Sequence, residues 1–191
     1  MSLFTESRVR TRARRETTTK SAGTILVERA RKQATFSKTH IFLSHAFDDR
    51  ELLVGAVLVI EDLGYSVYID WRDDPSLDRT KVTPATAAKL KERMNASECL
   101  LYAATPNATE STWMKWELGY KDGQSNRAAV LPIVGNVTEV YNTTQQFLGL
   151  YPYVSDGTTN DGKQHLWIHR SSTCYVEFGA WLAGHEPTER S

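Results

Sequence analysis

Residues 111–118, STWMKWEL, place one glutamate among tryptophans in a segment expected to be helical. Glu117 follows Trp113 by one helical turn, so a helix puts both side chains on one face, whereas Trp116 points about 100° away from Glu117. An ionised carboxylate avoids apolar surroundings unless it is paired or functional. Glu117 is therefore either a solvated neighbour of a packing residue or a carboxylate set into a pocket wall.

Other side chains able to do chemistry follow short apolar runs. SHAFDD follows the run HIFL, DWRDDP follows YSVYI, and TPNATESTW follows ECLLYAA. If these runs are strands of an open α/β sheet, the polar segments meet beyond the carboxyl ends of the strands, where ligands bind. The candidates there are Ser44, His45, Phe47, Asp70, Trp71, Arg72 and Trp113 with Glu117.

Strand-like and helical patterns alternate from residue 39 onward. The apolar runs predict strands at 40–44, 65–70, 98–105 and 128–134, and helical spacing predicts helices at 51–64, 84–97 and 111–123. Asp48 and Asp49 are expected to cap the first helix, and Thr83 with Pro84 is expected to begin the second. This alternation is typical of an α/β fold, a mostly parallel sheet with helices on both faces.

The C-terminal part departs from this alternation. Residues 147–154 predict an edge strand because they contain Pro152, and the Gly, Asp and Asn of 155–163 indicate a surface loop. Residues 165–170 predict a further strand, and 174–184 a closing helix. We therefore expect one extra strand and helix after the main sheet, within a domain that covers residues 39–191.

Residues 1–38 form a basic N-terminal extension, with ten Lys or Arg against three Glu, while the rest of the chain is acidic. The Arg- and Thr-rich segment 8–20 has few apolar residues, which predicts disorder, and residues 22–35 could form a short helix. A solvated tail is the simplest interpretation. The alternatives are contact with nucleic acid, with anionic lipid or with the acidic face of a second copy.

Composition excludes several classes of protein. The 191 residues contain no run of 18 or more apolar residues, which argues against a membrane span, and only two cysteines, as in a reducing cytoplasm. No glycine-rich phosphate loop and no hydrolase G-x-S-x-G motif occurs, and the five histidines lack the spacing of a metal site. We expect no metal, no cofactor, no membrane contact and no nucleic-acid partner.

Three motifs together resemble the Toll/interleukin-1 receptor (TIR) domain family. HIFLSHAFDD is similar to the family's box 1, the second strand and its long polar loop resemble the BB-loop region, and STWMKWEL resembles the SxW-x-x-x-E start of the third helix. The resemblance covers roughly residues 39–135, and the C-terminal part is more similar to prokaryotic stand-alone TIR proteins, including those of Thoeris anti-phage systems. It implies a flavodoxin-like three-layer sandwich with a central five-stranded sheet.

For TIR domains with enzyme activity, the resemblance implies cleavage of the nicotinamide–ribose bond of NAD⁺, which is then the substrate. The family's catalytic glutamate falls on Glu117. Nicotinamide leaves as a neutral molecule, so the reaction needs a carboxylate that stabilises an oxocarbenium-like transition state. Aromatic side chains would wall the rings, and hydroxyl or guanidinium groups would meet the diphosphate. The expected NAD⁺-binding residues are Ser44, His45, Ala46, Phe47, Trp71, Arg72, Arg79 and Trp113.

The product is left open between ADP-ribose and a cyclic or conjugated ADP-ribose that serves as an immune signal for a downstream effector. Self-association through TIR–TIR contacts is a further expectation. Two other functions compete with the enzyme. The first is a TIR adaptor that works only through such contacts, and the second is an enzyme similar to nucleoside 2-deoxyribosyltransferases, which the box 1 and loop matches disfavour.

Overall fold

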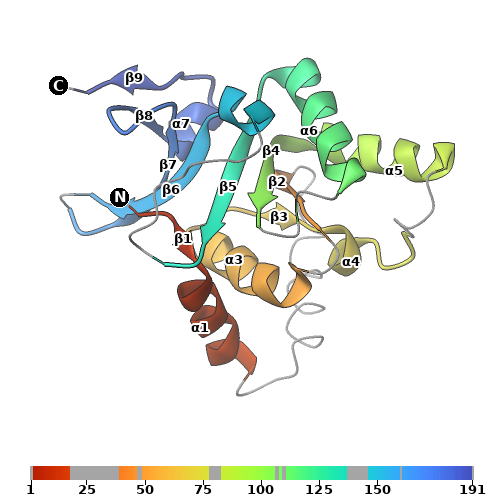
Figure 1. Ribbon diagram of the computed structural model, residues 1–191, viewed down its shortest axis with the longest axis horizontal. Helices are drawn as coiled ribbons and strands as arrows, with labels where there is room; N and C mark the ends of the chain where they lie inside the picture. Colours follow the sequence, from red (N-terminus) through yellow and green to blue (C-terminus); the bar gives the residue numbers. More distant parts are fainter. Residues whose placement is uncertain are drawn as a thin grey trace.

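The computed structural model describes residues 2–17, 39–46, 49–77, 83–105, 108, 111–136, 146–159 and 161–190. Its centre is one sheet with the strand order β3-β2-β4-β5-β6-β7-β8-β9 (Figure 1). The strands from β3 to β6 are parallel to one another. In chain order they are β2 (Thr39–Ser44), β3 (Val67–Tyr68), β4 (Ser97–Ala104), β5 (Ala128–Val134) and β6 (Tyr153–Thr158).

This order of five parallel strands, with the second strand along the chain at the edge and the first beside it, is that of the flavodoxin-like fold. The prediction of a mostly parallel five-stranded sheet is therefore confirmed. The predicted strands at 40–44, 98–105 and 128–134 agree closely with β2, β4 and β5, whereas the strand expected at 65–70 is reduced to two residues.

Helices cover both faces of the sheet, and alternate residues of its strands pack into two separate hydrophobic cores. In β4, Cys99 and Leu101 pack on the face that carries α1 and α3, while Leu100 and Tyr102 pack on the face that carries α5 and α6. Figure 1 shows these two pairs of helices on opposite sides of the strands. The helices are α1 (Glu6–Thr17), α3 (Arg50–Asp62), α4 (Asp70–Asp73), α5 (Pro84–Asn95), α6 (Thr112–Ser125) and α7 (Phe178–Leu182).

Side chains at the helix ends explain where α5 and α6 begin. Thr83 accepts a hydrogen bond from the backbone N–H of Thr86 at 3.1 Å, as the sequence predicted, with Pro84 in the first turn. Ser111 accepts one from the N–H of Met114 at 3.4 Å. The end expected at residue 123 is wrong, because α6 continues to Ser125 and closes on Asn126 in the left-handed conformation with φ 51°.

The C-terminal extension contains more strand than the sequence predicted. Strands β7 (Gln164–His169), β8 (Cys174–Glu177) and β9 (Thr188–Glu189) continue the sheet in antiparallel pairing. Residues 174–177 were expected to be helical, but they form β8 and pair with β7. The predicted edge position of this strand is wrong, because β6 lies between β5 and β7. Pro152 lies before the strand, where its carbonyl oxygen accepts a hydrogen bond from Val130 N at 2.8 Å. A short 3₁₀ helix, η3 (Gln146–Leu150), precedes β6.

The N-terminal segment is built into the domain. Strand β1 (Phe4–Thr5) pairs in parallel with Ile133 and Val134 of β5, and Ser2 pairs with Asp156 of β6. Helix α1 follows directly and packs on α3, with Val9 fully buried. The disorder predicted from the composition of residues 8–20 is thus wrong at least as far as Thr17, and the helix expected at 22–35 lies outside the described residues.

Among the described residues, no helix combines the length and the apolar character that crossing a membrane requires.

Candidate active site

Glu117 lies on the buried face of α6, at the carboxyl end of the parallel strands. Its neighbours Met114, Leu118 and Lys121 are also buried, because residues three to four positions apart share the face that packs on the sheet. The Ser44 hydroxyl at the end of β2 donates a hydrogen bond to Glu117 Oε2 at 2.5 Å. Both residues have an exposed fraction of 0%. The structure therefore joins the predicted catalytic carboxylate to one predicted site residue through a short, buried contact.

This hydrogen bond compensates part of the cost of burying a carboxylate. An ionised carboxylate in a protein interior needs donors, and a hydrogen bond to a charged group contributes about 1.5–3 kcal/mol. The serine had been expected to contact a diphosphate, but in this structure its hydroxyl is directed at Glu117. The hydrogen-bond partner of Ser44 is therefore Glu117 of α6.

His45 follows Ser44 and points to the opposite face of the sheet. Its Nδ1 lies 3.1 Å from the carbonyl oxygen of Leu43, and its Nε2 lies 3.3 Å from Asp70 Oδ1. Both His45 and Asp70 are 4% exposed. Asp70 also accepts from the backbone N–H of Trp71 at 2.6 Å, and the rings of His45 and Trp71 meet edge to face at 6.5 Å. Strand β2 is thus tied to α4 on one face and to α6 on the other.

Arg72 is directed away from Glu117. Its side chain is 1% exposed, and the guanidinium donates to Asp73 and to Glu61 of α3, each at 2.8 Å, and to the carbonyl of Val67. Burial alone lowers the pKa of Arg72, but the two carboxylates outweigh it and hold the pKa above its ordinary value. These contacts tie α4 to α3, so the structure does not bring Arg72 to the candidate carboxylate.

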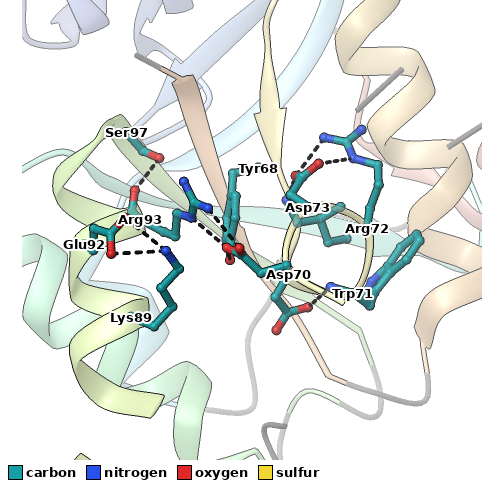
Figure 2. Close-up of polar contacts among 11 residues, drawn as sticks. Tyr68, Asp70, Trp71, Arg72, Asp73, Lys89, Glu92, Arg93 and Ser97 are labelled. Carbon is teal, nitrogen blue, oxygen red and sulfur yellow. Dashed lines mark hydrogen bonds and ion pairs between the residues drawn. The ribbon is translucent and has the colours of Figure 1, made fainter. Parts of the chain in front are cut away.

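A second arginine holds the other side of the same segment. Figure 2 shows Arg93 reaching this segment on the side away from Arg72. Arg93 of α5 donates to both oxygens of Asp74, at 2.6 and 2.8 Å, and Tyr68 donates to the same carboxylate at 2.9 Å. Burial raises the pKa of Asp74, but Arg93 and Tyr68 outweigh that effect and hold it below the ordinary value. The start of the long polar loop is therefore fixed from both faces of the sheet.

The aromatic residues of α6 form one row. Trp113 meets Trp116 edge to face at 5.3 Å, and Trp116 stacks on Tyr120 at 5.8 Å. The ammonium of Lys91 lies 5.9 Å and 5.4 Å from the ring centroids of Trp116 and Tyr120. All three rings are partly buried and pack against the core of that face. Trp113 is thus on the predicted helix face, but its ring also contacts the tryptophan that was expected to point elsewhere.

Of the remaining predicted residues, the structure describes two and leaves two outside the described residues. Ala46 is 7% exposed and packs into the core on the α5 and α6 side. Trp71 is partly buried against the core of the α1 and α3 side. Phe47 and Arg79 lie outside the described residues.

Sequence reasoning missed one contact at this edge. The predicted cap is wrong for Asp49, which stands at the N-cap position of α3 but makes no side-chain cap hydrogen bond, and Asp48 lies outside the described residues. Asp49 accepts instead from the hydroxyl of Thr105, the residue after β4. The sequence did contain a signal for this contact, because Asp49 follows β2 and Thr105 follows β4. Neighbouring parallel strands end at the same edge of a sheet, so residues that follow them lie close together.

No group of three or more His, Cys, Asp or Glu side chains in the described part of the chain has the arrangement of a metal site.

The chain is similar to several known proteins. No protein-family model matches the chain. A Bacillus cereus (strain MSX-D12) protein named "Probable 3' cyclic ADP-D-ribose synthase ThsB'" is 44% identical over 159 residues, which cover 82% of each chain. A Cytobacillus dafuensis protein named "Putative cyclic ADP-D-ribose synthase TIR2" is 32% identical over 81 residues, 42% of this chain and 21% of the relative. The TIR domain of the Toll-related receptor TRR-2 from Hydra magnipapillata superposes with a TM-score of 0.40 at 19% identity, over 55% of this chain and 76% of that structure.

Proposed function

This chain belongs to the family of ThsB'-type TIR proteins, and we propose that it cleaves the nicotinamide–ribose bond of NAD⁺ with Glu117 as the catalytic carboxylate. The observation that carries the proposal is the buried Glu117 at the carboxyl end of the parallel strands, held by Ser44. Its position is that of a ligand-binding group in an open α/β sheet.

The chemistry suits a single carboxylate. The bond from C1′ of the ribose to the pyridinium nitrogen breaks, its electron pair stays on nitrogen, and nicotinamide leaves neutral without a general acid. Positive charge then develops on the ribose, and Glu117 stabilises it in a low-dielectric site where electrostatic interactions are strong. Trp113, one turn before Glu117 on the same helix, is the aromatic group proposed to wall the substrate rings.

We propose further that the product is a cyclic ADP-ribose used as a signal in anti-phage defence. Both named relatives are described as cyclic ADP-D-ribose synthases. In a cyclisation, a hydroxyl of the same ADP-ribose replaces water as the nucleophile at C1′ and loses its proton. A downstream effector would then sense the product.

Substrate access requires a change from the structure described. Glu117 has no exposed surface, so NAD⁺ can touch its carboxylate only after a neighbouring group moves. Self-association through TIR–TIR contacts is the change that we propose opens the site. If the open form is a minority in the free protein, the apparent affinity for NAD⁺ falls by the same fraction.

The test is purified protein incubated with NAD⁺, both dilute and concentrated enough to assemble, with nicotinamide release followed by chromatography and the second product identified by mass. We expect release from the assembled protein and at least a hundredfold loss in E117Q. The matched control is E92Q, because Glu92 is an exposed carboxylate on neighbouring α5 whose partner is Lys89. It should retain activity.

Two results would count against the proposal. If neither the free nor the assembled protein releases nicotinamide, the adaptor function takes its place. If E117Q and E92Q are equally active, the enzyme uses another carboxylate.

A further inference from the structure

The end of β2 presents two successive polar side chains to opposite faces of the sheet. Ser44 points toward α6 and contacts Glu117, while His45 points toward α4 and contacts Asp70. All four residues are buried, with exposed fractions of 0% for the first pair and 4% for the second. Two adjacent residues, Ser44 and His45, therefore contact two different buried carboxylates.

Both ring nitrogens of His45 face oxygen atoms. Nδ1 lies 3.1 Å from the carbonyl oxygen of Leu43, and Nε2 lies 3.3 Å from Asp70 Oδ1. The ring is therefore held between its own strand and α4.

We propose that Ser44 is a positioning residue for Glu117 and that the His45–Asp70 pair holds Ser44 in place from the opposite face of β2. Ser44 fixes which way the Glu117 carboxylate faces, and it needs no contact with the substrate to do so. His45 and Asp70 restrain the backbone that carries Ser44. This inference rests on the proposed function, since it assigns roles around the same carboxylate.

The kinetic test separates this role from the diphosphate contact expected from the sequence. Loss of a contact made to the substrate in both ground and transition states raises KM and leaves kcat unchanged, whereas misplacement of Glu117 lowers kcat. For S44A we expect kcat to fall by about tenfold to a hundredfold, with less than a twofold change in KM. S44T keeps the hydroxyl and should recover most of kcat. S125A removes an exposed serine hydroxyl at the far end of the same helix and should have no effect.

The pH profile of kcat provides a readout that a merely structural role would not change. A hydrogen bond from Ser44 to the ionised carboxylate favours that form, so its removal should move the acidic limb of the profile to higher pH. D70N should also lower kcat. In the S44A background D70N should add little, because residues that act through one another are not additive.

A second measurement does not depend on activity. Urea unfolding of wild type, S44A, E117Q and the double variant gives the coupling between the two side chains, which we expect to be favourable. If the wild type releases no nicotinamide while this coupling is present, the proposed function fails and the contact stands. If the wild type is active and S44A raises KM with unchanged kcat, or if the coupling is absent, the positioning role is overturned.

Discussion

The packing of α1 on α3 makes a specific prediction for Gly55. A methyl group added at this position would overlap the carbonyl group of Val9 and lie 3.0 Å from its Cα, whereas ordinary van der Waals contact requires 3.4–4 Å. All of these atoms belong to the backbone, so no side-chain rotation can relieve the overlap. In G55A helix α1 must therefore withdraw from α3 by roughly 1–2 Å.

The expected cost combines two opposing terms. Overpacking of a close helix contact costs about 1–3 kcal/mol, while replacing glycine by alanine inside a helix gains about 0.5–1 kcal/mol. We therefore expect G55A to lower the free energy of unfolding by about 1–2 kcal/mol, which for a chain of this size lowers Tm by about 3–6 °C. The ion pair of Arg12 with Asp62 lies on the surface and contributes too little to hold α1 in place.

Gly123 provides the matched control. It lies in α6, is exposed, and a methyl group there would meet no atom within 4 Å. The same substitution, G123A, should raise the free energy of unfolding by about 0.5–1 kcal/mol. The assay is urea and thermal unfolding of both variants, with limited trypsin digestion to detect cleavage among the arginines of α1. If the two substitutions shift stability equally, or if G55A leaves α1 as resistant to trypsin as in the wild type, α1 does not pack as described.

Two further predictions concern the dependence of stability on pH. The pKa of Asp74 in the folded protein lies below its ordinary 3.8, so its contacts with Arg93 and Tyr68 stabilise the fold above pH 3.8, and this stabilisation is lost as the pH falls through the folded-state pKa. Urea unfolding should show that wild type is more stable than D74N above pH 3.8 and that the difference in their free energies of unfolding becomes smaller below it. A difference that stays constant with pH would contradict the assignment. The pKa of His169 is lowered from 6.5, mainly by burial, so the neutral imidazole stabilises the fold above pH 6.5, and this contribution declines as the pH falls below 6.5. H169Q should reduce the dependence of the free energy of unfolding on pH in this range. If the slope of unfolding free energy against pH is unchanged in H169Q, the dependence belongs to another group.

The alternation of apolar strands and amphipathic helices was sufficient to predict the parallel sheet, because buried strands and helices have different periodicities. It also placed Glu117 correctly at the carboxyl edge, since Ser111 marks the start of α6 and the strand before it is unambiguous. The Ser44–Glu117 contact could not be predicted, because it depends on how α6 is rotated over β2. Residue spacing within either segment does not fix that rotation.

The prediction of disorder in the N-terminal segment was wrong for a related reason. Phe4 and Val9 are two of the few apolar residues in a basic sequence, and composition alone favours disorder there. Both are fully buried because β5 and α3 offer complementary surfaces, a tertiary effect that no local pattern encodes. Residues 174–177 were misread as helix because four residues are too few to separate the two periodicities.

The pairing of β1 with β5, and of Ser2 with Asp156, has a consequence for how the chain is made. Residues 2–5 have no strand partners until β5 and β6 have been synthesised, some 130 to 154 positions later. Until then Phe4 stays exposed, and closing so long a loop is slow compared with forming local helices. We expect chains that end before residue 128 to leave β1 unpaired, so that this strand is among the last parts of the domain to fold.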